Sequence, residues 1–257
     1  MIDCDSLDYA QARVWARHGQ CAGELHWPRL QSAREFTTVL EAARETPLRR
    51  WLDGITATAS AHAIEAVLRS QWRAAVDEVA RWMPGPWQPA VRWCGVLPEL
   101  PLVEHLAQGH EAPGWMDDDP DYRALAAVPV AQRRTLLSTG RFAPLVGDGA
   151  EPGTLAHAWQ SHWRRLWPRG QGHAGLEAVA AALREHAAGF TSAGGASHAW
   201  LLRRTLQARL SLMLRRAGGE PALAFIHLAL TAIELERLRG ELLGRALFAP
   251  LAHGRTA

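Results

Sequence analysis

The sequence predicts an all-α protein, and three observations lead to this prediction. Apolar residues recur at the three- and four-residue spacing of amphipathic helices along most of the chain. No segment has the convincing alternation of apolar and polar residues that a half-buried strand requires. Clusters of Pro and Gly lie between the periodic segments, where they would end one helix before the next begins. We therefore expect a multi-helical body without a sheet.

The first third of the chain contains helix-start signals that can be located individually. Ser32 followed by Glu35 has the spacing of a capping box, in which each side chain satisfies a backbone amide of the opening turn. Ser60 is expected to open a long helix whose apolar stripe runs from Ile64 to Val79. The Pro-Gly-Pro run at residues 84–86 should end that helix, because proline lacks an amide donor and crowds the preceding turn.

The last third predicts a second series of helices. Thr154 is expected to cap one, and residues 176–187 carry the apolar face of another. A Leu-rich helix from about Ser197 to Arg216 should end before Gly218 and Gly219, since glycine suits the left-handed exit of a helix. Pro221 should start a final helix that reaches about Phe248. The first half of this helix is apolar nearly all round and is expected to be buried.

Two stretches of the chain resemble each other, and they predict the domain organisation. His62–Val67 (HAIEAV) and His173–Val179 (HAGLEAV) each open a long helical segment. This similarity favours two related lobes. We expect an N-terminal helical lobe at 1–110, an acidic and Gly/Pro-rich connecting region with a short helix at 111–153, and a C-terminal helical lobe at 154–257.

Composition excludes several classes of protein. The 257 residues include 28 basic and 26 acidic side chains, so 28 − 26 gives a net charge of +2, and a nucleic-acid partner is not expected. The N-terminus is acidic and polar, unlike a signal peptide, and no apolar run approaches the ~18 residues of a membrane span.

Twelve Trp residues are an unusual number, and Trp often packs layers or lies at interfaces. Cys4, Cys21 and Cys94 are too sparse for a disulfide framework and are expected to be reduced.

No catalytic motif or cofactor signature emerges from the residues, and the strongest metal candidate is an acidic triplet. Asp117, Asp118 and Asp121 have the DDxxD pattern, which in all-α diphosphate enzymes holds Mg²⁺. Here the pattern contains Pro120, lies in a Gly/Pro-rich break, and lacks a facing carboxylate cluster. A solvated acidic loop is the simpler interpretation, and an α-helical Mg²⁺-dependent diphosphate enzyme remains the alternative.

Arginine pairs recur along the chain, and lysine is absent. Pairs of this kind either face solvent or build a protein-partner surface, because Arg and Trp are enriched at the centres of interfaces. The pairs are Arg49-Arg50, Arg133-Arg134, Arg164-Arg165, Arg203-Arg204 and Arg215-Arg216.

Three segments resemble the central-stalk socket protein of V-type rotary ATPases, whose family is designated C in bacteria and archaea and d in eukaryotes. Residues 9–17 (YAQARVWAR) are similar to the opening helix of that family, and residues 36–52 (FTTVLEAARETPLRRWL) to its second segment. Residues 221–244 (PALAFIHLALTAIELERLRGELLG) resemble its closing helix, in which an acidic residue precedes a Leu-Arg pair, here Glu234 and Leu238-Arg239. The family is usually longer and three-lobed, so this chain would be a divergent and shortened member.

The resemblance implies a non-enzymatic function. A member of this family forms a concave, funnel-shaped socket that links the rotor shaft to the membrane proteolipid ring, and so supports ATP-coupled ion transport. The implied location is cytoplasmic, peripheral to the membrane through partner subunits, with no cofactor. A free-standing helical scaffold for protein interaction is a further alternative. The arginines expected at the partner interface are Arg13, Arg17, Arg164, Arg165, Arg203 and Arg204.

Overall fold

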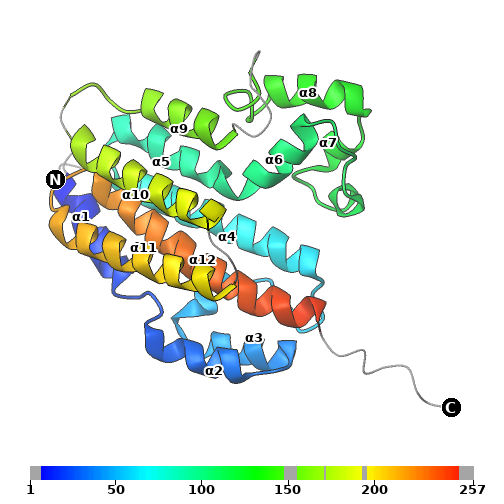
Figure 1. Ribbon diagram of the computed structural model, residues 1–257, viewed down its shortest axis with the longest axis horizontal. Helices are drawn as coiled ribbons and strands as arrows, with labels where there is room; N and C mark the ends of the chain where they lie inside the picture. Colours follow the sequence, from blue (N-terminus) through cyan, green and yellow to red (C-terminus); the bar gives the residue numbers. More distant parts are fainter. Residues whose placement is uncertain (1–6, 148–154, 171, 193–195, 249–257) are drawn as a thin grey trace. The chain divides into compact units, whose positions relative to one another are not determined.

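A computed structural model describes residues 7–147, 155–170, 172–192 and 196–248 (Figure 1). All regular elements among these residues are helices, so the predicted all-α class is confirmed. The chain forms two compact units, one made of Met1–Gly85 with Arg169–Ala257 and the other of Pro86–Pro168. These boundaries do not coincide with the expected divisions at 110 and 153, and the organisation into two related lobes stays a prediction.

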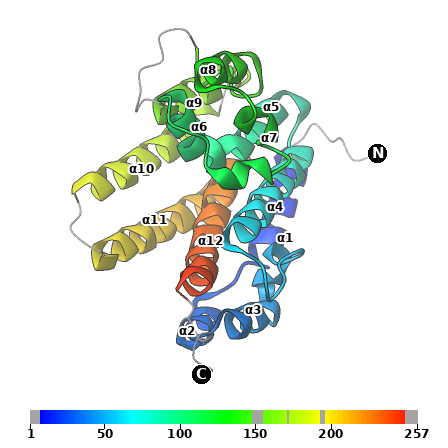
Figure 2. The same ribbon diagram turned by 90° about the vertical axis from the view of Figure 1, so that its right-hand side faces the viewer.

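The first unit is built around α12 (Ala222–Leu247), which contacts α11, α4, α10, α1 and α3. In both views of the ribbon α12 runs between α11 on one side and α4 on the other (Figures 1 and 2). Every residue from Ala222 to Leu228 is buried, as the apolar pattern predicted. The other elements of this unit, where η denotes a short 3-10 helix, are α1 (Leu7–His18), η1 (Glu24–His26), α2 (Trp27–Ser32), α3 (Phe36–Arg44), η2 (Pro47–Trp51), α4 (Ala61–Trp82), α10 (His173–Ser192) and α11 (Ala196–Arg216).

Helix α4 follows its sequence signals closely. The helix starts after Ser60 as predicted, and the Ser60 side chain caps it by accepting a hydrogen bond from the Ala63 amide at 3.2 Å. The stripe from Ile64 to Val79 is buried at three- and four-residue spacing, and it packs against α12. The helix ends at Trp82, just before the Pro-Gly-Pro run.

The capping box predicted at Ser32 and Glu35 is wrong. Ser32 is the last residue of α2, and its hydroxyl donates to the Arg29 carbonyl at 2.9 Å. Helix α3 starts with Glu35 at its N-cap, in extended conformation and without a side-chain cap bond. The physical reason is Pro28, which lies in the opening turn of α2 and starts a helix early enough to include Ser32.

Two other predicted boundaries have different outcomes. Helix α11 ends at Arg216, and Gly219 adopts a positive φ of 71° as expected for the chain's exit before α12. The Gly219 amide donates to the Gln11 Oε1 atom at 2.7 Å, which ties this turn to α1. The predicted cap at Thr154 lies outside the described residues.

The second unit is a smaller helical body held by tryptophans and a buried ion pair. The Trp93 indole donates to the Trp159 carbonyl at 3.1 Å, and the Trp159 indole donates back to the Trp93 carbonyl at 3.3 Å. Glu99 is buried and pairs with Arg141 at 2.6 Å. The elements of this unit are η3 (Gly85–Trp87), which begins at the unit boundary, α5 (Gln88–Trp93), η4 (Cys94–Glu99), α6 (Leu100–Ala107), η5 (Gly114–Asp117), α7 (Arg123–Ala126), α8 (Val130–Thr139) and α9 (Leu155–Arg165).

Candidate functional site

Glu234 joins three distant parts of the first unit. This carboxylate lies on α12 and is 8% exposed. Its Oε1 atom accepts hydrogen bonds from Arg50 Nη2 at 2.6 Å and from Trp51 Nε1 at 2.9 Å. Its Oε2 atom accepts from the Ala22 amide at 2.7 Å. A buried carboxylate is stable only when its lone pairs are used, and here three donors from two other segments use them.

The local structure of η2 places two of these donors. The Thr46 side chain caps η2 by accepting from the Leu48 amide at 3.2 Å, and Pro47 occupies the first turn where no amide is needed. Leu48 and Trp51 are buried and anchor this short helix in the core. The Arg50 guanidinium then lies 4.6 Å from the centre of the Trp51 ring, so both side chains approach Glu234 together.

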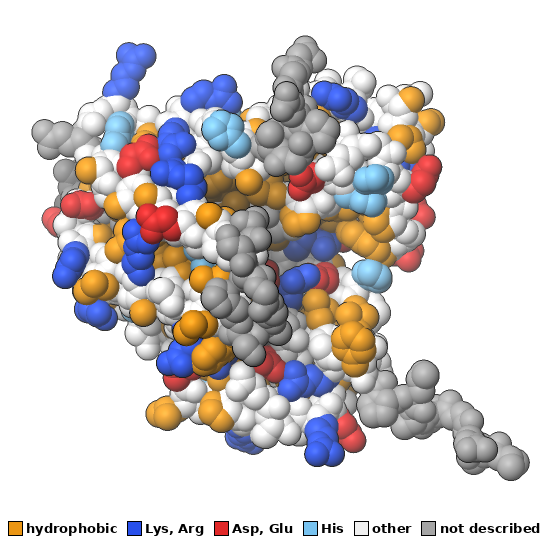
Figure 3. Space-filling view, viewed as in Figure 1, with side chains coloured by type: hydrophobic (Ala, Val, Ile, Leu, Met, Phe, Trp, Pro, Cys, Tyr) orange, Lys and Arg blue, Asp and Glu red, His pale blue; other side chains and the backbone are white. Residues whose placement is uncertain are grey.

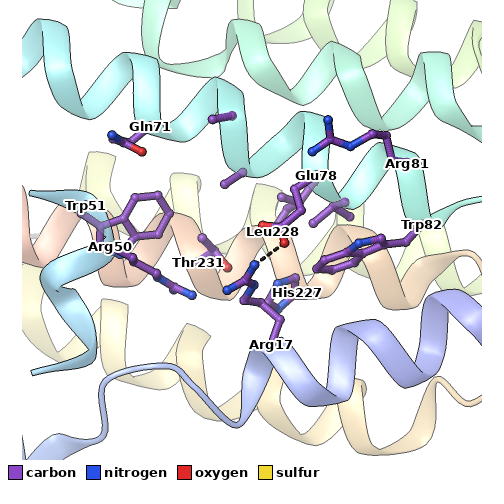
Figure 4. Close-up of a pocket in the computed structure, with 13 residues that line it drawn as sticks. Arg17, Arg50, Trp51, Gln71, Glu78, Arg81, Trp82, His227, Leu228 and Thr231 are labelled. Carbon is purple, nitrogen blue, oxygen red and sulfur yellow. Dashed lines mark hydrogen bonds and ion pairs between the residues drawn. The ribbon is translucent and has the colours of Figure 1, made fainter. Parts of the chain in front are cut away.

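A cavity of about 290 Å³ lies beside this junction, between α1, η2, α4 and α12. Trp51 and Trp82 stand on opposite sides of it (Figure 4). Arg17 reaches across from α1 and forms an ion pair with Glu78 of α4. The polar and charged residues that line the cavity are Arg17, Arg50, Gln71, Glu78, Arg81, His227 and Thr231.

A second hollow of about 600 Å³ shares Arg17 and Arg50 with the cavity. Arg44 and Arg49 add two further guanidinium groups to its lining. The one carboxylate that lines it, Glu45, pairs with Arg29 at 2.5 Å. We call this hollow the arginine hollow, because cations dominate its charge. On the face shown in Figure 3, arginines and carboxylates are interspersed rather than gathered in one field.

His227 and Thr231 are polar residues in the most buried part of α12. They lie one turn apart, both line the cavity, and they are 2% and 3% exposed. Neither His227 Nδ1 nor Thr231 Oγ1 has a hydrogen-bond partner among the described residues. Unpartnered buried polar atoms are rare in native proteins, and this unit contains further ones at His18 Nδ1, Arg50 Nε and Arg237 Nε.

Electrostatics keeps the His227 ring neutral. Burial lowers the pKa of His227 to about 3, and His18, Arg50 and Arg17 contribute further in the same direction. Burial also lowers the pKa of His18, which lies at the end of α1, although Glu234 opposes this shift. At physiological pH, His227 therefore offers the cavity one nitrogen that donates and one that accepts.

The described cysteines are not activated thiols. Burial raises the pKa of Cys21, and the nearby Glu234 carboxylate raises it further against the opposing effect of Arg50. Burial raises the pKa of Cys94 to about 12. Both side chains are unbridged, and the third cysteine, Cys4, lies outside the described residues. Neither pKa favours the thiolate that a nucleophilic cysteine needs.

The acidic triplet lies in the second unit, at η5 and the turn after it. Asp117, Asp118 and Asp121 are exposed, whereas Asp119 between them is buried and accepts a hydrogen bond from the Asp121 amide at 3.0 Å. Within the described part of the chain, no group of three or more His, Cys, Asp or Glu side chains is arranged to hold a metal ion. The bonding seen here is that of a turn in which an aspartate side chain caps the backbone.

The six arginines expected at a partner interface are spread over three helices. In α1, Arg17 lines the cavity and Arg13 lies 5.4 Å from the Trp82 ring centre. In α11, Arg203 and Arg204 are exposed and lie near the rings of Phe190 and Trp200, at 5.6 and 4.7 Å. In α9 of the second unit, Arg164 is half-buried and Arg165 donates to His162 at 3.2 Å. Of the six, the cavity includes Arg17 alone.

Sequence reasoning did not single out His227, Thr231, Glu78 or Arg81 as site residues. A signal for two of them was present, because His227 and Thr231 interrupt an otherwise apolar run on a helix expected to be buried. Polar residues at such positions need partners, and this requirement alone points to a site. Glu78 and Arg81 carried no such signal, since charged residues on an amphipathic helix ordinarily face water.

Comparisons with family models, with curated proteins and with solved structures found no match for this chain. In the described part of the chain, no helix combines the length and the apolar character that crossing a bilayer requires.

Proposed function

We propose that the chain is a non-catalytic adaptor of the central stalk of a V-type rotary ATPase, where it links the rotor shaft to the membrane proteolipid ring. One observation carries this proposal: the three segments that resemble the family, far apart in sequence, meet at one cavity. Arg17 comes from the first segment, Arg50 from the second and His227 from the third. All three segments belong to one compact unit, as the shared core of one fold would require.

The arginine hollow supplies the chemistry that such an adaptor needs on its shaft side. Its guanidinium groups offer planar donor pairs that match carboxylates, which favours acidic side chains of a partner protein. The Arg49 side chain is exposed and makes no hydrogen bond or ion pair with a described residue, so its charge is available to a partner. We infer that acidic residues of the shaft bind here, and that the chain reaches the membrane only through its partner subunits.

The direct test is recovery of partners from native membranes. A tagged chain, expressed at its normal level, is purified after mild solubilisation, and the associated proteins are identified by mass spectrometry. Shaft and proteolipid-ring subunits should be recovered together with it. Their absence from the eluate, with all of them present in the solubilised input, would refute the proposal.

A matched pair of charge reversals locates the contact. Arg49→Glu should lower recovery of the shaft subunits about tenfold or more, because it places a carboxylate opposite acidic partner residues. Arg134→Glu, at an exposed arginine of α8 in the second unit, is the control and should leave recovery unchanged. Equal recovery with both variants would exclude the arginine hollow as the contact surface.

A further inference from the structure

We propose that the cavity between α1, η2, α4 and α12 is a binding site for a small molecule that carries a carboxylate or phosphate group. This inference does not depend on a rotary ATPase or on any protein partner. It is based on three features of the cavity: buried polar atoms without partners, an excess of positive charge, and walls that suit a small ligand.

The first feature is the pair of buried polar atoms that have no hydrogen-bond partner. Thr231 Oγ1 and His227 Nδ1 lie next to the cavity and lack a hydrogen-bond partner among the described residues. Both side chains are almost fully buried, so bulk water cannot hydrate them as it hydrates surface groups. A threonine hydroxyl in a helix commonly bonds to the carbonyl four residues earlier, but no such bond is formed at Thr231. A ligand in the cavity would supply the acceptor that this hydroxyl lacks.

The charge of the lining selects an anion. Arg17, Arg50 and Arg81 contribute three positive charges, and Glu78 is the carboxylate among the lining residues. Glu234 pairs with Arg50 from outside the lining, which leaves three cations against two carboxylates. His227 remains neutral, so it adds a hydrogen-bonding group without adding charge. An anion would therefore be attracted to this cavity, and a cation would not.

The volume of the cavity and the residues that line it limit which ligands fit. A volume of about 290 Å³ is at the lower end of the usual range for small-molecule sites, so a small ligand fits better than a nucleotide. Leu228 and Val79 contribute apolar wall, and the side chains of Trp51 and Trp82 lie on opposite sides of the space (Figure 4). These walls accommodate a short apolar or flat portion beside the anionic group.

Ordered water is the rival occupant, because one or two water molecules would satisfy the same polar atoms. Water and an anion differ in their consequences. Water binding leaves the stability of the protein independent of dissolved anions, whereas a bound anion raises stability as its concentration increases above the dissociation constant. This difference can be measured on the protein as it is.

The experiment titrates the full chain with inorganic phosphate, and separately with acetate and with succinate, at ionic strength held constant with chloride. Calorimetry should give a saturable signal, and the midpoint of thermal unfolding should rise with the same ligand. Saturation by phosphate alone identifies a phosphate-bearing ligand, and saturation by the carboxylates alone identifies a carboxylic acid. No saturable binding of any of the three would overturn the proposal and leave water as the occupant.

Thr231→Val is the decisive variant. Valine keeps the shape of threonine and removes a buried hydroxyl that has no partner among the described residues, so the variant should fold at least as well as the original chain. It should weaken binding of the saturating anion about tenfold, because a hydrogen bond to a charged group is lost. The control is Thr205→Val at an exposed position of α11, where the hydroxyl donates to the Leu201 carbonyl at 3.0 Å. Equal affinity in the Thr231→Val variant and the original chain would show that the anion binds elsewhere.

Discussion

The two halves of α12 differ in whether their buried polar side chains have partners. From Glu234 onward the charged side chains form ion pairs: Glu234 bonds to Arg50, Arg237 pairs with Glu24 at 2.9 Å, and Arg239 pairs with Glu65. Among the buried polar atoms of these α12 side chains, Arg237 Nε alone has no hydrogen-bond partner among the described residues. In the first half, by contrast, the buried polar atoms of His227 and Thr231 have none among the described residues. Polar groups that hold a fold together are normally satisfied within it. The contrast therefore separates an ion-paired, structural half of the helix from the half that lines the proposed binding site.

The largest expected effect comes from Glu234, which marks the boundary between the two halves. Glu234→Ala leaves Arg50, the Trp51 indole and the Ala22 amide without their common acceptor. Breaking a buried ion pair from one side costs about 3 kcal/mol or more of unfolding free energy. Urea denaturation measures this loss. The exposed Glu236 on the same helix is the control, and Glu236→Gln should change stability by less than about 0.5 kcal/mol. A comparable loss at both positions would show that the buried hydrogen bonds of Glu234 do not set its contribution to stability.

Lowering the pH tests the first half of α12, which contains His227. The pKa of His227 falls from its ordinary value of 6.5 to about 3 on folding. Between these two pH values the imidazole is protonated in the unfolded chain and neutral in the folded chain. The stability that neutral His227 provides is therefore complete above pH 6.5 and is lost as the pH falls toward 3. The slope due to this one residue is at most about 1.4 kcal/mol per pH unit. Urea denaturation across this range should show a shallower decline for His227→Gln than for the original chain.

The exposed His157 on α9 supplies the control for this pH series. His157→Gln should preserve the slope of the original chain over the same acid range. If His227→Gln instead declined as steeply as the original chain, a group other than His227 would be responsible for the acid sensitivity.

Helices whose signals are local were predicted well from the sequence. The start of α4 at Ser60 and the buried first half of α12 depend on residues within a few turns of each other, and the structure confirms both. The capping box at Ser32 failed because Pro28, slightly earlier in the chain, started a competing helix. Local signals thus decide an element only where no nearby signal of comparable strength competes with them.

The candidate site could be predicted only in fragments. Glu234 was noted through the family resemblance, but its donors lie at Ala22, Arg50 and Trp51, far away in sequence. No periodicity connects such residues, because the packing of α12 against other elements brings them together. One clue was local: a histidine and a threonine inside an apolar run. Its meaning follows only once the structure places those side chains beside a cavity, with no partner among the described residues.

The smallest expected effect concerns the ion pair between Arg239 and Glu65, in the satisfied half of α12. Arg239 donates through Nε at 2.8 Å and through Nη2 at 2.5 Å to the same carboxylate oxygen, and the Glu65 hydrogen bond raises the pKa of Arg239. The Arg239 side chain is still 41% exposed, so water can replace its partner. Glu65→Gln should therefore cost only about 0.5–1 kcal/mol, and the difference should shrink in about 1 M salt. A loss as large as that of Glu234→Ala would show that burial does not determine how much each ion pair contributes to stability. A loss of the expected size would instead sharpen the contrast: having a partner defines the structural half of α12, and burial sets how much each partner contributes.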